Sequence, residues 1–129
     1  MVKKYNNISR KEFLYRFFDL YNFLQFEDHR LTKKEIRFVI EVMSLPEKFK
    51  YDRFSTKARN YLRTKLASED WVLSVQGISQ LIQSLEKKEV IILDSDNIRQ
   101  INPILEPFFN KKKRDYFFTF AFNLKKDEL

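Results

Sequence analysis

Four stretches of the sequence combine a Ser or Thr helix cap with apolar residues at helical spacing, and this repeated pattern is the strongest constraint on the fold. The caps are Ser9, Thr32, Ser55 and Ser74. After the first two caps, Glu12 and Glu35 stand three residues further on, which is the spacing of a capping box. The pattern predicts a first helix over residues 10–24, a second that ends before Pro46, and two more that follow the last two caps.

Each predicted helix places its large apolar residues on one face, which is the face expected to form the core. In chain order these residues are Phe13, Leu14, Phe17, Phe18, Tyr21, Leu24, Ile36, Val39, Ile40, Met43, Ala58, Tyr61, Leu62, Leu66, Ile78, Leu81, Ile82 and Leu85. The chain has 129 residues, which is enough for one core and too short for two ordinary domains.

Beyond the fourth helix the pattern changes to that of strands. VIIL at residues 90–93 is rich in β-branched residues, DSDN at 94–97 has turn chemistry, and NIRQI at 97–101 can pair back. A Pro-punctuated connection with a basic cluster follows at 102–115, and YFFTFAFNL at 116–124 alternates as a strand does. The aromatic face of that strand comprises Phe118, Phe120, Phe122 and Leu124. The sequence thus predicts a mainly α protein with a small β-hairpin, an α+β fold, and a C-terminal aromatic strand.

The order of helix, helix, turn, helix and two-stranded hairpin resembles the winged helix-turn-helix layout. The helix pair is KARNYLRTKL and VQGISQLIQSLEKK, and LTKKE before it and INP after the hairpin add to the resemblance. These features are similar to small MarR-like and replication-initiator-like proteins, which are frequent in bacteria and tailed phages. The resemblance covers roughly residues 30–105, and it depends on the order of the motifs, because none of them is diagnostic alone.

This resemblance implies a domain over residues 1–105, with the helix at 10–24 preceding its core. Residues 106–129 would then form a basic connector, the C-terminal strand and a tail. The resemblance also implies that Val90 and Ile92 face the core. Glu89 stands where relatives often have Gly, which implies a less abrupt bend at the end of the fourth helix.

Composition argues against most small-molecule enzymes. The chain has no Cys, one His and one Gly, so it lacks thiolates, multi-histidine metal sites and Gly-rich phosphate loops. The acidic triplets DSD and SED offer carboxylates for a metal, but acids in turns and at helix caps have ordinary local roles. We therefore expect a protein that is not an enzyme and that takes no cofactor, metal or small-molecule substrate.

No run of 18 apolar residues is present, and the first residues have charges where a signal peptide would be apolar. These features predict a protein without a membrane partner in the cytoplasm of a bacterium or an infected host cell, or in a virion. KDEL at residues 126–129 matches a retrieval signal, and we interpret that match as coincidental.

The charge is unevenly distributed along a chain whose formal net charge is +7. Residues 1–66 have 16 basic and 8 acidic side chains, whereas residues 67–101 have 3 basic and 6 acidic ones. Affinity for DNA depends largely on neutralising phosphates. The fourth helix and the hairpin would therefore supply little of it, and most phosphate contacts would have to come from other segments.

The candidate DNA-binding residues fall into two groups. Phosphate contacts are expected from Lys57, Arg59, Arg63, Lys65, Lys111, Lys112, Lys113 and Arg114, with Lys33, Lys34 and Arg37 as further cations. Contacts from the outward face of the fourth helix are expected from Gln76, Gln80, Gln83 and Lys87, because a Gln amide can pair with adenine. An exposed charged or glutamine-rich helix face is also what any solvated helix has, so this alternative remains open.

Two functions follow from these features. The first is a winged-helix protein that binds double-stranded DNA, as a phage or bacterial transcriptional regulator or a replication accessory factor. The second is a phage structural or assembly protein, such as a virion or connector subunit, in which the winged helix docks on other proteins. The acidic hairpin turn and the aromatic strand favour the second function, because that strand must either cover its own core or pair with another chain in an oligomer.

Overall fold

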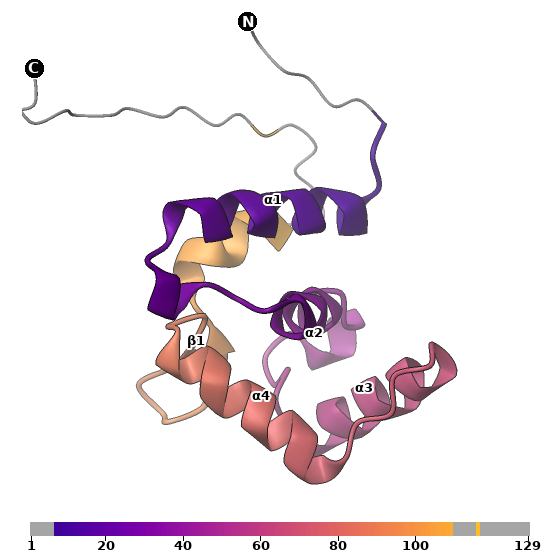
Figure 1. Cartoon of the computed structure of the whole chain (residues 1–129). Helices are drawn as coiled ribbons and strands as arrows, with labels where there is room; N and C mark the ends of the chain where they lie inside the picture. Colours follow the sequence, from indigo (N-terminus) through magenta and orange to yellow (C-terminus); the bar gives the residue numbers. More distant parts are fainter. Residues whose placement is uncertain (1–6, 110–115, 117–129) are drawn as a thin grey trace, which may run out of the picture.

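The computed structural model describes residues 7–109 and Tyr116. Its four α-helices are α1 (Arg10–Leu24), α2 (Lys33–Met43), α3 (Thr56–Ser68) and α4 (Val75–Lys87). The strands β1 (Ile91–Leu93) and β2 (Arg99–Ile101) pair antiparallel, and the 3-10 helices are η1 (Glu27–His29), η2 (Glu47–Phe49) and η3 (Pro103–Phe109). The described chain is therefore mainly helical with one small hairpin, as the sequence predicted (Figure 1).

All four predicted helix caps are present. The hydroxyl oxygens of Ser9, Ser55 and Ser74 each accept a hydrogen bond from the backbone N–H three residues later, at 2.9–3.2 Å. Thr32 forms the full capping box: its Oγ1 accepts from Glu35 N at 3.1 Å, and its own N–H donates to Glu35 Oε1 at 2.8 Å. Each cap satisfies a backbone N–H that has no partner within its helix, and so fixes where the helix begins.

Helix α2 is the centre of the fold, and eight of its 11 residues are buried. In Figure 1 it is seen end-on, with α1 on one side and α3 and α4 on the other. Phe38, Ile40 and Val42 are fully buried. Two predicted core residues are wrong: Leu24, the last residue of α1, is 52% exposed, and Tyr61 of α3 is 39% exposed although its ring packs beside the buried Phe49.

The hairpin follows α4 through a sharp reversal at Glu89, whose φ is 62°. The N–H of Val90 donates to the carbonyl of Leu85 at 3.0 Å, and the N–H of Glu89 donates to that of Glu86 at 3.1 Å. This pair of bonds is a Schellman motif, which normally has Gly at the left-handed position. The expectation of a less abrupt bend is therefore wrong, because Glu89 adopts the conformation that Gly would supply.

The same reversal sets which strand residues are buried. Ile91 pairs with Ile101 and both are buried, whereas Ile92 pairs with Gln100 and is only half-buried. Val90 is buried as expected, but it precedes the strand and is covered through the turn. The expectation that Ile92 faces the core is wrong, because alternate strand residues point to opposite sides and Ile91 takes the inner one.

We expect Glu89→Gly to raise the free energy of unfolding by about 0.5–1 kcal/mol, because the strain of a left-handed L-residue exceeds the entropic cost of glycine. Lys87→Gly, two residues earlier in helical backbone, is the matched control and should lower it by a similar amount. Urea denaturation of the two variants measures both changes. A loss of stability in Glu89→Gly would contradict the assigned strain.

Residues 103–109 form a 3-10 helix where the sequence predicted an irregular connection. Leu105 is buried and Phe108 partly buried, and their spacing of three places them on one face of such a helix. The Phe108 ring stacks on Phe17 of α1 at 4.1 Å, and the Tyr116 ring stacks on Phe13 at 4.4 Å. The predicted aromatic face at residues 118–124 lies outside the described residues.

Candidate nucleic-acid interface

The outward face of α4 is a polar stripe of four residues, Gln76, Gln80, Gln83 and Lys87. All four are exposed. At 100° per residue they fall within about 60° of arc, opposite the buried Ile78, Ile82 and Leu85. None of the four side chains has a hydrogen bond or ion pair to another part of residues 7–109 or to Tyr116. The stripe is therefore available to an external partner, and we call it the α4 stripe.

One flank of α4 is attached to the first turn of α2 through Glu35. This carboxylate is 3% exposed and accepts from the Ser84 hydroxyl and the Lys88 ammonium, each at 2.6 Å. Burial raises the pKa of Glu35, but the hydrogen bonds from Lys88, Ser84 and Thr32 N lower it more, so the net pKa lies below its usual value. The ionised carboxylate thus fixes the orientation of α4 on α2.

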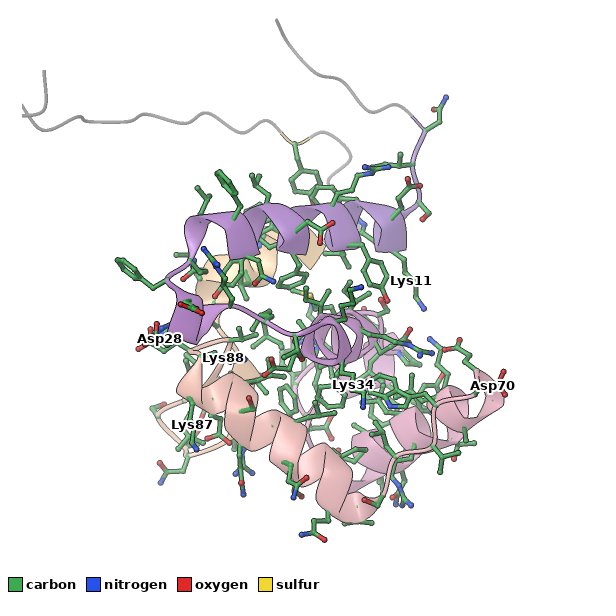
Figure 2. All side chains as sticks on the ribbon, viewed as in Figure 1. Lys11, Asp28, Lys34, Asp70, Lys87 and Lys88 are labelled. Atoms are coloured by element: carbon green, nitrogen blue, oxygen red, sulfur yellow. The ribbon has the colours of Figure 1, made fainter. Side chains whose placement is uncertain are left out.

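Two exposed lysines, Lys33 and Lys34, begin α2 next to this contact. Within the described part of the chain neither has an ion pair. Figure 2 shows Lys34 at the visible end of α2, on the side of that helix that faces α3 and α4. This edge of the α4 stripe therefore has positive charge that no acid among residues 7–109 neutralises.

The other flank of α4 meets the hairpin. Arg99 of β2 donates from Nε to Glu86 Oε1 at 2.7 Å. A small cleft between the hairpin and the start of α3 is lined by Ser55, Asn97 and Arg99, among others. The start of α3, including the exposed Lys57, is therefore close to the hairpin edge of the interface. Arg99 was not among the predicted site residues; the only sequence signal was a lone cation following the acidic turn.

The acidic turn of the hairpin has a structural cause. The Asp94 carboxylate accepts from the backbone N–H of Asp96 at 2.8 Å and of Ile98 at 3.0 Å, and from Gln100 Nε2 at 3.3 Å. The bond from Ile98 N–H is the largest cause, and together with the bonds from Asp96 N–H and Gln100 it lowers the pKa of Asp94 against the opposing effect of desolvation. The carboxylate at this position therefore holds the turn together.

Three of the four cations predicted on α3 are used inside the molecule. Arg59 Nε donates to the carbonyl of Phe54 at 2.8 Å, and Arg63 Nε donates to that of Leu73 at 2.9 Å. Burial lowers the pKa of Arg59, and the nearby guanidinium of Arg99 lowers it further, against the opposing effect of Glu86. The bond from Arg63 to the Leu73 carbonyl joins α3 to the connector that leads into α4.

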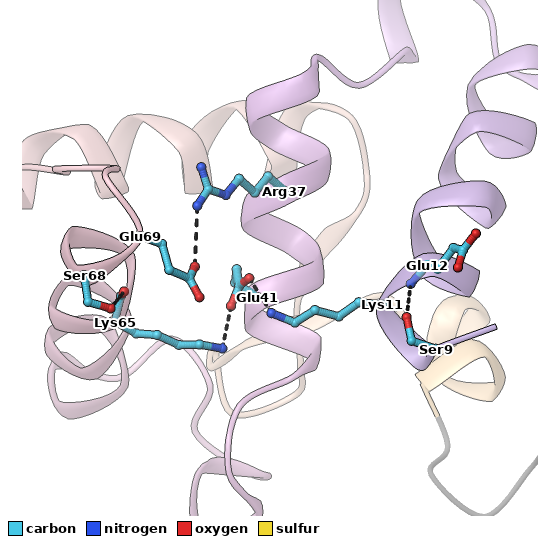
Figure 3. Close-up of polar contacts among 8 residues, drawn as sticks. All are labelled: Ser9, Lys11, Glu12, Arg37, Glu41, Lys65, Ser68 and Glu69. Atoms are coloured by element: carbon cyan, nitrogen blue, oxygen red, sulfur yellow. Dashed lines mark hydrogen bonds and ion pairs between the residues drawn. The ribbon is translucent and has the colours of Figure 1, made fainter.

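Lys65 pairs with Glu41 of α2 at 2.8 Å, and Lys11 of α1 approaches the same carboxylate at 2.8 Å (Figure 3). Burial raises the pKa of Glu41, but the two lysines lower it more, so it lies below its usual value; the hydrogen bond to Glu41 raises the pKa of Lys65. Lys57 is exposed and has no partner among the described residues. Of the predicted α3 cations, Lys57 is thus the one with an uncommitted charge.

Other predicted site residues are placed as follows. Arg37 pairs with Glu69 at 3.5 Å and lies over the Trp71 ring at 4.8 Å, so its charge is partly used. The basic cluster Lys111, Lys112, Lys113 and Arg114 lies outside the described residues.

Within the described ranges, no three His, Asp or Glu side chains are grouped to hold a metal ion. No helix there is long and apolar enough to cross a membrane.

Comparison of the chain with protein-family models, with curated proteins and with solved structures gives no match.

Proposed function

We propose that the protein is a nonenzymatic winged-helix protein that binds double-stranded DNA, with α4 as the helix that enters the major groove. In this assignment α3, the connector at 69–74 and α4 are the helix-turn-helix, and β1 and β2 are the wing. The observation that carries the proposal is the α4 stripe: a face of three glutamines and one lysine whose side chains have no hydrogen bond within the described residues, bordered by uncommitted lysines on both flanks.

The division of charge matches the two tasks of such an interface. Phosphate contacts position a protein on the duplex, and contacts to base edges provide sequence preference. Lys33 and Lys34 on the α2 flank and Lys57 on the hairpin flank are exposed cations that can reach the phosphates on either side of a groove. The stripe between them is then free to contact bases. The role would be that of a phage or bacterial transcriptional regulator or replication accessory factor, in the cytoplasm.

A salt series of duplex binding tests the proposal, with the double variant Lys34→Gln/Lys57→Gln. We expect wild type to bind at low ionic strength, with an affinity that falls steeply as the salt concentration rises. The double variant should bind more weakly, and its slope of log affinity against log salt concentration should be smaller by about two, which is about one for each lost phosphate contact. Fluorescence anisotropy at several salt concentrations provides both quantities. Arg59 and Arg63 are left in place because their Nε atoms hold backbone carbonyls, so changing them would also disturb the fold.

Arg16→Gln is the control for this experiment. Arg16 is an exposed cation on α1, and α2 separates α1 from α4 (Figure 1). The substitution removes one charge, as each lysine change does, but away from the proposed interface, so the salt slope should stay close to that of wild type. Absent binding at low ionic strength, or binding that does not respond to salt, would exclude the proposal.

The exposed apolar residues at the end of α1 favour a second function. Phe23 and Phe26 are 74% and 84% exposed, and Leu24 between them is half exposed. Adjacent exposed apolar residues are typical of protein contact sites. The alternative is accordingly a phage structural or assembly subunit, located in the virion, that docks on other proteins. A strict monomer at high concentration that joins no larger particle would count against it.

A further inference from the structure

The three glutamines of the α4 stripe are equivalent in their surroundings. Gln76, Gln80 and Gln83 are exposed, and no hydrogen bond within the described chain occupies their amides. Each amide has an N–H₂ donor and a C=O acceptor side by side at its end. The only acid of α4 near the stripe is Glu86, and it is directed toward Arg99. The stripe therefore presents three identical donor–acceptor pairs in a row.

This pattern fits one base edge better than the others. In the major groove adenine has an acceptor at N7 beside a donor at N6, which a Gln amide complements with two hydrogen bonds. Guanine has two acceptors, O6 and N7, which are best matched by the double donor of Arg or by Lys. The stripe has no Arg, and its one Lys, Lys87, lies at its C-terminal end.

The spacing of the glutamines sets the length of the site. With a rise of 1.5 Å per residue, Gln76 and Gln83 are about 10.5 Å apart along the helix axis. Base pairs follow one another at about 3.4 Å, so this distance corresponds to about three base pairs. We infer that α4 selects duplexes with a run of about three A·T pairs and contacts the adenine edges through Gln76, Gln80 and Gln83. This inference rests on the proposed DNA-binding function and names its substrate class.

The test compares two duplexes of equal length and identical flanks, one with an A·T core and one with a G·C core. Wild type should bind the A·T duplex at least about a hundredfold more tightly, which is the discrimination expected of three bidentate contacts that each contribute at least about fivefold. The double variant Gln80→Ala/Gln83→Ala should lose most of this ratio while its affinity for the G·C duplex stays nearly constant. Both residues are exposed, and an unchanged thermal melting curve confirms that the variant is folded.

Two further measurements separate base contacts from other sources of preference. Replacing adenine by 7-deazaadenine removes the N7 acceptor and should reduce the affinity of wild type for the A·T duplex more than that of the double glutamine variant, which keeps only Gln76. Gln80→Arg should shift the preference toward the G·C duplex, because Arg supplies two donors to guanine. Lys57→Gln is the matched control. It removes a proposed phosphate contact and should lower the affinity for both duplexes by the same factor.

The outcomes distinguish this inference from the function on which it rests. Salt-dependent binding without preference for A·T pairs would overturn the inference and leave DNA binding intact. A preference that survives both the glutamine substitutions and 7-deazaadenine would also overturn it, since DNA shape would then be the cause. Failure to bind either duplex at low salt would overturn both.

Discussion

Glu35→Ala is expected to lower the free energy of unfolding by about 3 kcal/mol, because it leaves Lys88 without its partner in a mostly buried position. Lys88 is 17% exposed, which places the effect toward the lower end for a broken buried ion pair. The substitution also removes the acceptor for Ser84 and the reciprocal half of the Thr32 capping box. Chemical denaturation measures the change. Because this contact orients α4, the same variant should also weaken duplex binding.

Glu47→Ala is the control. Glu47 is largely exposed and its nearest cation, Lys50, is 3.7 Å away, so the free energy of unfolding should change by no more than about 0.5 kcal/mol.

The dependence of stability on pH provides a second measurement of the role of Glu35. The pKa of Glu35 is lower in the folded protein than in the unfolded chain. Its contribution to the free energy of unfolding is therefore fully present above the pKa of the unfolded chain and is lost as the pH falls toward the pKa of the folded protein. Between about pH 5 and pH 3, wild type should therefore lose more stability than Glu35→Gln. Parallel profiles would show that Glu35 contributes nothing to acid unfolding.

Phe18→Ala is expected to lower the free energy of unfolding by about 3–5 kcal/mol, which is the usual loss when a fully buried ring is removed and the surroundings relax only partly. Phe18 is 0% exposed and packs edge-on against Phe17 and Tyr21. Such a loss is comparable with the whole stability of a small domain, which is about 5–15 kcal/mol. Phe23→Ala on the same helix is the control and should change stability by less than about 0.5 kcal/mol. Equal urea midpoints for the two variants would contradict the assigned core.

The helices were predictable because their signals are local. A hydroxyl that caps a helix bonds to a backbone group three residues away, so Ser9, Thr32, Ser55 and Ser74 mark helix starts without any knowledge of the rest of the chain. The buried faces follow from the same periodicity, and the opposite face of α4 follows with them. The α4 stripe, which carries the proposed function, could therefore be predicted from the sequence.

The roles of the α3 cations could not be predicted in the same way. Lys65 is held by Glu41, which lies in the preceding helix, and Arg63 is held by a carbonyl in the following connector. These partners are brought close only by the packing of α3 on its neighbours, so spacing within α3 says nothing about them. Lys57 and Lys65 lie on the same helix. Only the packing of α3 shows that Lys65 has an acid partner, whereas Lys57 has none among the described residues.

The end of α4 shows a different reason for a wrong prediction. A left-handed position is usually inferred from Gly, and this chain has a single Gly in 129 residues. Asp70 and Glu89 take that conformation after α3 and α4, with φ values of 64° and 62°. In both places the Schellman bonds and the apolar residue that follows, the partly buried Trp71 and the buried Val90, outweigh the strain. The shift from Ile92 to Ile91 as the inner strand residue is a direct result of this turn.

The stacking of η3 on α1 joins the two ends of the described chain, and this affects how the protein is made. Phe17 meets Phe108, and Phe13 meets Tyr116, so helix α1 acquires these partners only from the last part of the described sequence. Helix α1 precedes η3 in the chain, so during translation its aromatic face is without Phe108 and Tyr116 until those residues have been synthesised. Contacts of such long sequence separation form late and slow the folding of small domains. Helix α1 thus completes its packing only after η3 has been made, and during that interval its aromatic face is open to chaperones or to other nascent chains.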